Sequence, residues 1–265
     1  LIECANAIQN LKEISTSSKL IKGLIFGHED YLNDIGGFDM EGNENLIYPR
    51  SKIIVAAKAN NLIAIDTPFL NLKDKKDLQV LKNIIKKSDI LIQNLAPGAF
   101  ERLGLNLKEL RDKHPKLITC SITGFGEKGP YMKQKAYDML IQAETGLTDL
   151  TGVPENEIEK GRSRVGVSVC DISAGMTALN AVLQALIGRE KTGKGRHISV
   201  SLFSALSDWM NVPYLQYVYS NKEPKRCGIR HPTITPYASF ECADNLEILI
   251  GIQNCLLYTS DAADE

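Results

Sequence analysis

The sequence predicts an α/β fold in which parallel strands alternate with helices. Two observations lead to this prediction: short apolar runs of strand length alternate with longer amphipathic stretches, and polar residues follow directly after the apolar runs. The chain has 265 residues, of which 43% are hydrophobic, and this is enough for one large core or two modest ones. Such an alternation favours an open parallel sheet or a β/α barrel.

The first segment, residues 1–70, has the element order of a partial β/α barrel. Apolar pairs and triplets predict its strands, and amphipathic stretches between them predict its helices. Strands are expected at residues 1–2, 23–27 and 62–66, and helices at 7–15 and 50–60.

The second segment, residues 71–220, repeats this order and is expected to form a large domain. A long alanine- and leucine-rich helix is expected at 172–189, ended by Gly193 and Gly195. Residues 221–254 are expected to form a linker and the start of a small domain. Further helices are expected at 77–87 and 107–114, strands at 90–92, 117–122, 197–202 and 248–253, and a turn at Pro97 and Gly98.

Composition excludes several classes of function. The chain carries 31 Lys and Arg against 32 Asp and Glu, so it lacks the basic surface of a nucleic-acid-binding protein. The apolar run at 53–57 is far shorter than the roughly 20 residues that span a bilayer, so we expect no membrane segment and a cytoplasmic protein. Six cysteines without a C-x-x-C pair indicate neither a zinc site nor a disulfide framework, and we expect them to be buried thiols.

Carboxylates follow two of the expected strands in the first segment. Glu3 follows the first strand, and Glu29 and Asp30 follow the second, so in a β/α barrel they would project where barrel active sites lie. Two carboxylates with water suit Mg²⁺. On spacing alone, helix caps or solvated loop acids are the favoured interpretation of Glu3 and Asp30, although spacing does not settle the question.

Asp171 lies between an apolar stretch containing Val167 and Val169 and the long predicted helix. Asp is a favoured N-cap residue at such a position. The helix N-terminus also stabilises an anion, which would keep the carboxylate ionised for nucleophilic attack. Spacing alone favours the helix cap for Asp171, and this role does not exclude that of a nucleophile.

Three blocks of the second segment resemble the family III CoA-transferases, the group of formyl-CoA transferase, carnitine CoA-transferase and α-methylacyl-CoA racemase. The resemblance covers residues 71–254 and is carried by NLKDKKDLQVLKNIIKKSDILIQNLAPGAFERLGL, PKLITCSITGFGEKGPYMKQKAYDMLIQAETGLTDLTG and VSVCDISAGMTALNAVLQALIGREKTGKGRHISVSLFSAL. It implies a Rossmann-like parallel-sheet domain, a homodimer, and Asp171 as a nucleophile that forms an aspartyl-CoA thioester through mixed anhydrides.

The same resemblance assigns further site residues. Tyr137 occupies the position at which the racemase branch has a catalytic histidine, and this favours transfer over racemisation because tyrosine is a poor base at neutral pH. A buried aromatic residue with a hydrogen-bonded hydroxyl is the alternative for Tyr137. Arg102 and Lys135 match positions that contact CoA phosphates. The loop beside CoA corresponds to Asn94, Pro97 and Gly98, and a glycine-rich loop follows at Gly124, Gly126 and Gly129.

The first segment resembles a different family, the barrel aldolases of the citrate lyase β-subunit and malyl-CoA lyase group. LIECANAIQNLKEI, GLIFGHEDYLNDIGG and NLIYPRSKIIVAAKANNLIAIDTPF carry this resemblance over residues 1–69. It implies that Glu3 and Asp30 hold Mg²⁺, which polarises the oxygen of an acyl-CoA substrate. Strands that carry the family's substrate-binding arginine and close the barrel are absent from the segment.

The two resemblances give three hypotheses about function. The first is a CoA-transferase that moves CoA between an acyl-CoA and a carboxylic acid, with a dicarboxylic acid favoured. The second is a Mg²⁺-dependent citrate lyase-like or malyl-CoA lyase-like C–C lyase, and the third is an inactive chimeric fragment of the two families. Residues 255–265, CLLYTSDAADE, resemble a translated sequencing adapter and are expected to lie outside the fold.

Overall fold

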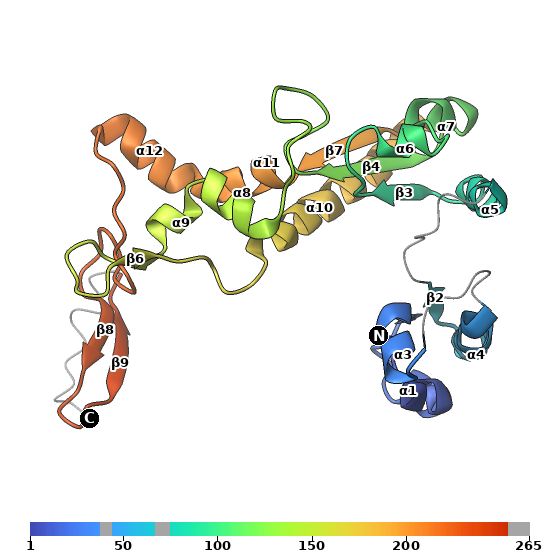
Figure 1. Cartoon of the computed structure of the whole chain (residues 1–265), viewed down its shortest axis with the longest axis horizontal. Helices are drawn as coiled ribbons and strands as arrows, with labels where there is room; N and C mark the ends of the chain where they lie inside the picture. Colours follow the sequence, from blue (N-terminus) through green and yellow to red (C-terminus); the bar gives the residue numbers. More distant parts are fainter. Residues whose placement is uncertain (38–43, 67–74, 254–265) are drawn as a thin grey trace. The chain divides into compact units, whose positions relative to one another are not determined.

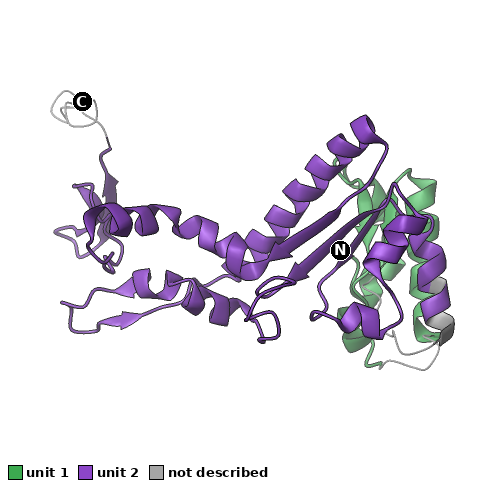
Figure 2. Ribbon diagram, turned by 90° about the horizontal axis from the view of Figure 1, so that it is seen from above, with its two compact units in different colours: residues 1–74 green, residues 75–265 purple. Residues whose placement is uncertain are grey.

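The computed structural model describes residues 1–37, 44–66 and 75–253. The adapter-like segment 255–265 lies outside these residues. The chain divides into two compact units, Leu1–Asp74 and Lys75–Glu265 (Figure 2). Each unit combines helices with parallel strands, which confirms the predicted α/β fold class.

The first unit is built on parallel strands covered by helices. Ile2 forms a parallel bridge with Phe26, and β1 pairs in parallel with β2, which Figure 1 labels. The predicted helix 7–15 is interrupted at Asn10, whose side-chain amide donates to the carbonyl of Asn6 and competes with the regular helical pattern. The elements of this unit are α1 (Ala5–Gln9), α2 (Leu11–Thr16), β1 (Gly23–Ile25), α3 (His28–Asp34), α4 (Glu44–Ala59) and β2 (Ile63–Ile65).

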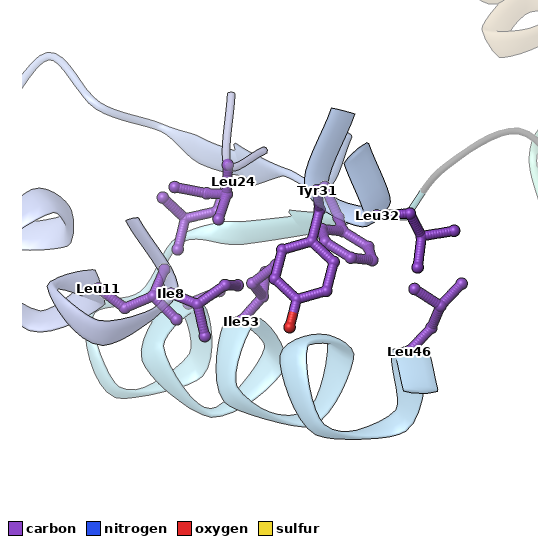
Figure 3. Packing of buried hydrophobic residues seen from close by; sticks show 10 residues of the cluster. Ile8, Leu11, Leu24, Tyr31, Leu32, Leu46 and Ile53 are labelled. Atoms are coloured by element: carbon purple, nitrogen blue, oxygen red, sulfur yellow. The ribbon is translucent and has the colours of Figure 1, made fainter. Parts of the chain in front are cut away.

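In the described part of the first unit, one hydrophobic cluster packs the helices against the strands (Figure 3). Leu24 of β1 packs with residues from the helices, and Tyr31 of α3 packs its ring 5.5 Å from that of Phe26. Leu46 and Ile53 of α4 are fully or almost fully buried in the same cluster. Every residue of this cluster belongs to the first unit.

The second unit has a three-stranded parallel sheet in the order β3, β4, β7. The strands are β3 (Ile90–Gln93), β4 (Ile118–Thr123) and β7 (His197–Ser201). The long helix α10 (Val169–Thr192) covers one face of the sheet (Figure 1). Its alanines pack against the strands. This hydrophobic cluster contains Ile118, Cys120, Ala174, Ala178, Val182, Ala185, Ile198, Val200 and Ala205.

Three helices pack with Leu117 and Leu91, which alternate with the residues that face α10 and therefore point to the opposite face of the sheet. These helices are α5 (Lys75–Ile85), α6 (Ala99–Arg102) and α7 (Leu107–Lys113). The sheet is thus covered on both sides, as parallel sheets usually are.

The remaining elements of the second unit are short helices and two antiparallel hairpins that the sequence patterns did not predict, except for the strand at 248–253, which corresponds to β9. They are α8 (Asp138–Glu144), α9 (Leu147–Leu150), β5 (Gly152–Val153), β6 (Gly161–Arg162), α11 (Leu202–Ser207), the 3₁₀ turn η1 (Asp208–Met210), α12 (Asn211–Ser220), β8 (Tyr237–Glu241) and β9 (Glu247–Gly251).

The prediction that the cysteines are buried thiols is only partly correct. Cys120 and Cys170 are fully buried, but Cys4 and Cys227 are half-buried and Cys242 is exposed. Cys242 directly follows β8 in the turn to β9, where the hairpin leaves its side chain in water. Cys255 lies outside the described residues.

Among the described residues, α10 is the one helix long and apolar enough to cross a bilayer. This is weak support for a membrane span, because a core helix passes the same test. Its small residues pack against the sheet, as expected of a core helix.

Candidate active site

The carboxyl ends of the three parallel strands form one edge of the second unit's sheet. Residues 94–98 follow β3, residues 124–137 follow β4, and α11 follows β7. The beginning of α10 lies at the same edge, because the hydroxyl of Ser173 donates to the carbonyl of Ala205 in α11 at 3.0 Å. Ligands of open α/β sheets commonly bind at this edge.

Asp171 is not the N-cap of the long helix, contrary to one of the two sequence-based readings. The helix begins earlier, with Ser168 as N-cap, and Asp171 lies in its first turn with an exposed side chain. Val169 and Cys170 pack against Ile141 and Leu206, and this burial extends the helix by a turn beyond the predicted start.

Asp138 of α8 takes the capping role expected of Asp171. Its Oδ1 accepts a hydrogen bond of 2.8 Å from the backbone N–H of Cys170, one of the amide groups that the helix itself leaves unpaired. Fully buried Gln142 donates to Asp138 Oδ2 at 2.6 Å and accepts from the N–H of Val165 at 2.9 Å. The start of α10 is therefore fixed by a carboxylate from another helix.

This arrangement makes Asp171 less acidic than an ordinary aspartate. Although the side chain of Asp171 is exposed, partial desolvation of its carboxylate raises the pKa of Asp171, and the like charge of Asp138 raises it further. Burial, Asp138 and Asp171 together raise the pKa of the Cys170 thiol to about 12. The thiol is therefore neutral at physiological pH and is a poor nucleophile, whereas the carboxylate of Asp171 is exposed.

Gly124 allows the predicted site residues Lys135 and Tyr137 to approach the end of β4. A Cβ atom on Gly124 would lie only 2.2 Å from the Cβ of Ala136, so a larger residue cannot be accommodated without movement. Lys135 is exposed, and Tyr137 is the N-cap of α8 with 67% of its surface exposed. This exposure contradicts the alternative that Tyr137 is a buried aromatic residue.

Tyr137 and Asp171 are each next in sequence to one partner of the same hydrogen bond, the bond between Cys170 and Asp138. Tyr137 directly precedes Asp138 in the chain, and Asp171 directly follows Cys170, whose N–H donates to Asp138. Sequence reasoning did not identify Asp138 or Gln142. The only signal for Asp138 was its place in the KAYD motif next to Tyr137.

The predicted CoA-loop residues gather at the end of β3. Asn94 follows this strand, and Pro97 and Gly98 form the turn that leads into α6. Gly98 has a φ of 76°, which favours glycine, and Nη1 of Arg102 lies 3.2 Å from the position of a Cβ on Gly98. The sheet order is β3, β4, β7, so the loop after β3 and helix α11 after β7 lie on opposite sides of the end of β4.

A cavity of about 400 Å³ lies beside the loop after β4. Phe125 and Gly126 line it together with Ser199 and Ser201 of β7, and α11 closes one side. A larger cavity of about 1020 Å³ lies among α8, α9, α12 and residues 223–226. Asp171 lines neither cavity and stands exposed at the sheet edge.

In the first unit, Glu3 lies beside the start of α3. Its Oε2 is 3.3 Å from the position of a Cβ on Gly27, the residue that precedes this helix. Asp30 is exposed in the first turn of α3. The described residues of the chain contain no group of three or more His, Cys, Asp or Glu side chains that could hold a metal ion.

Comparison with known families identifies the second unit. Residues 67–258 match CoA-transferase family III. The chain belongs to this family. Residues 1–86 match the HpcH/HpaI aldolase/citrate lyase family. Both resemblances seen in the sequence are thereby confirmed, and the two matched ranges overlap at residues 67–86.

Family III relatives and a solved structure agree with this assignment. The chain is 37% identical to acetyl-CoA:oxalate CoA-transferase of Acetobacter aceti over 66% of its own length, and 34% identical to human succinyl-CoA:glutarate CoA-transferase over 70%. It spans 44% and 41% of these two relatives, which is less than half of each. A CaiB/BaiF family protein from Brucella suis has a TM-score of 0.62 and 34% identity, over 71% of this chain and 47% of that protein.

Proposed function

We propose that the second unit carries the reaction centre of a CoA-transferase, with Asp171 as the temporary carrier of CoA. The observation that carries this proposal is the placement of an exposed carboxylate in the first turn of α10, at the carboxyl edge of a parallel sheet in a family III chain. The N-terminus of α10 favours the ionised form of Asp171, whereas burial and Asp138 oppose it.

The proposed reaction is a series of acyl exchanges. The carboxylate of Asp171 attacks the thioester of the donor acyl-CoA and forms a mixed anhydride, and the CoA thiolate leaves. The thiolate then attacks the aspartyl carbonyl, which gives an aspartyl-CoA thioester and the free donor acid. The acceptor carboxylate then attacks the aspartyl-CoA thioester, which forms a second mixed anhydride and releases the CoA thiolate. The thiolate attacks the acceptor carbonyl of this anhydride, which gives the new acyl-CoA and free Asp171.

The surrounding residues would bind the two substrates. Arg102 and Lys135 are exposed cations at the strand ends that suit the phosphates of CoA, and Asn94, Pro97 and Gly98 would form the wall beside it. The names of the relatives include oxalate, glutarate and mesaconate transferases, and these acids are dicarboxylic. We therefore propose an acyl-CoA donor and a dicarboxylic acid acceptor.

The test is to trap the acyl-enzyme. The chain is incubated with succinyl-CoA and hydroxylamine, and we expect a hydroxamate on Asp171 in the peptide mass spectrum. Asp171→Asn is expected to lose this modification, whereas Asp112→Asn, in an exposed aspartate of α7, is expected to keep it. Unmodified Asp171 in the wild-type chain at saturating acetyl-CoA and succinyl-CoA would overturn the proposal.

A second candidate function belongs to the first unit. We propose that Glu3 and Asp30 bind Mg²⁺, which would supply Lewis acidity for an acyl-CoA lyase reaction. The match to the aldolase/citrate lyase family and the position of Glu3 at the start of α3 support this proposal. Two carboxylates and water form a donor set that Mg²⁺ accepts.

The metal proposal is tested by direct binding of Mn²⁺ as a paramagnetic substitute for Mg²⁺. We expect the water relaxation rate to report one site that Glu3→Gln weakens about tenfold, as loss of one charged ligand predicts. Glu13→Gln, in α2, is the matched control. Equal affinity in wild type and Glu3→Gln would contradict the proposal.

A further inference from the structure

One face of the second unit's sheet carries a row of polar side chains. On β4, Ile118 and Cys120 pack against α10, so the alternating residues Thr119 and Ser121 point to the opposite face. The register of the sheet places His197 beside Thr119, and Ser199 beside Ser121. Thr119 and Ser121 are fully buried, whereas His197 is half-buried and Ser199 is exposed, so the polar row runs from the interior of the unit to its surface.

Glu127, from the loop after β4, reaches back along this polar row. Its Oε2 lies 2.9 Å from Nε2 of His197. Burial acts to raise the pKa of Glu127, but His197 together with the hydroxyls of Ser121 and Ser199 lowers it. His197 is the first residue of β7, whereas the loop leaves β4 level with the last residue of β7. The loop must therefore fold back over the strands for Glu127 to reach His197.

The hydrogen bonds of His197 indicate that the pair of Glu127 and His197 anchors the loop after β4. Its Nε2 contacts Glu127, and its Nδ1 contacts Oγ1 of Thr119 at 2.9 Å. Thr119 Oγ1 in turn accepts from Nη1 of Arg111 in α7 at 2.8 Å. Because both ring nitrogens are engaged, His197 has no free nitrogen with which to exchange a proton with a substrate.

The anchored loop ends at the candidate active site. Residues 124–136 begin at the end of β4 and lead directly to Tyr137 and Asp138. Within the loop, Phe125 packs its ring 5.8 Å from that of Phe203, and Ala136 packs against Gly124. Apolar contacts thus hold the two ends of the loop, and Glu127 holds the part between them.

We propose that Glu127 is a positioning residue: by bonding His197 across the polar face of the sheet, it fixes the loop that presents Lys135 and Tyr137 beside Asp171. This inference rests on the proposed function of Asp171. The loop contains Lys135, which is proposed to bind CoA, but not Asp171, which is proposed to carry out the acyl exchange. We therefore expect loss of Glu127 to weaken acyl-CoA binding more than it slows the reaction of bound acyl-CoA.

The experiment measures labelling of Asp171 by succinyl-CoA and hydroxylamine as a function of succinyl-CoA concentration. We expect Glu127→Ala to raise the half-saturating concentration about tenfold, the effect of one lost charge-assisted hydrogen bond, with a smaller change in the maximal rate. Glu127→Gln keeps an oxygen that accepts from His197 and is expected to restore most of the affinity. Glu159→Ala, an exposed glutamate between β5 and β6, is the matched control.

Hydrogen exchange of the same variants follows the loop itself. We expect faster exchange in residues 124–136 of Glu127→Ala and wild-type exchange in Glu127→Gln. Equal half-saturating concentrations in wild type and Glu127→Ala would overturn the positioning role while leaving Asp171 as carrier. Absence of labelling in the wild-type chain would overturn the proposed function and this inference together.

Discussion

Asp171 combines an exposed position with an environment that opposes its ionisation. Burial and Asp138 raise its pKa, so the folded protein holds the proton of Asp171 more tightly than the unfolded chain does. Stability then falls as the pH rises from the unfolded pKa through the raised folded pKa. At neutral pH the ionised carboxylate therefore costs stability, and the proposed reaction requires this ionised form.

Asp171→Asn is expected to raise the melting temperature at pH 7, because the amide has the size of the carboxylate without its charge. The gain should disappear below a pH of about 3.9, where Asp171 is protonated in both states. Thermal unfolding at both pH values measures this difference, with Asp112→Asn as the exposed control. The same gain at both pH values would show that charge is not its cause.

The cysteines differ in reactivity for the same physical reasons. The pKa of about 12 leaves roughly one Cys170 thiol in ten thousand ionised at pH 8, and the thiol is also fully buried. Burial likewise raises the pKa of Cys120. We expect iodoacetamide to modify exposed Cys242 first, and to modify Cys170 only after denaturation, as measured by peptide mass spectrometry. Modification of native Cys170 at the rate of Cys242 would contradict the arrangement of α8 and α10.

At the scale of elements, the contact between β4 and the loop after it depends on Gly124. We expect Gly124→Ala to lower the free energy of unfolding by about 1–3 kcal/mol, because its Cβ would overlap the Cβ of Ala136. The double variant Gly124→Ala with Ala136→Gly removes the overlap and should recover most of this loss in urea unfolding.

Gly175→Ala is the matched control for a glycine that has no steric role. It lies in α10, and no heavy atom stands within 4 Å of its added Cβ. Alanine has the higher helix propensity, so this variant should gain about 0.5–1 kcal/mol. A loss in Gly175→Ala equal to that in Gly124→Ala would mean that contact with Ala136 is not the cause.

The elements that could be predicted from the sequence are those with their own periodicity. The strands β3, β4 and β7 and the helix α10 were expected within a few residues of their observed bounds, because each has a recognisable local pattern: short stretches with regularly placed apolar residues in the strands, and a long alanine- and leucine-rich stretch in α10. The short helices α8 and α11 were not predicted. They are held by tertiary contacts, such as those of Ile141 and Leu206 with Cys170, which local patterns do not contain.

Only the motif residues of the candidate site could be predicted from the sequence; the residues that hold them in place could not. Asp171 and Tyr137 came from motif resemblance, whereas the hydrogen bond from Cys170 to Asp138 and the pair of Glu127 with His197 join residues 32 and 70 positions apart. Such long-range pairs depend on how β4, α8 and α10 pack. The predicted start of α10 was late for the same reason, since burial of Val169 and Cys170 extends the helix.

At the scale of the whole molecule, the chain joins two units with separate hydrophobic cores. The cluster around Leu24 and Leu46 lies within residues 1–74, and the clusters around α10, α7 and α8 lie within residues 75–265. The two family matches meet in the same region, at residues 67–86. Independent cores predict that each unit unfolds by itself.

The single tryptophan makes this independence measurable, because Trp209 lies in the second unit and its fluorescence reports unfolding of that unit alone. Leu46 and Ile141 are both fully buried, one in each unit, and truncation of either to alanine is expected to cost about 2–5 kcal/mol. Ile141→Ala should therefore move the urea midpoint of the fluorescence transition to lower concentration. Leu46→Ala should leave the fluorescence midpoint unchanged. It should shift only the unfolding of the first unit, which far-ultraviolet circular dichroism detects and fluorescence does not. If Leu46→Ala shifted the fluorescence midpoint as much as Ile141→Ala does, the two cores would unfold as one cooperative structure.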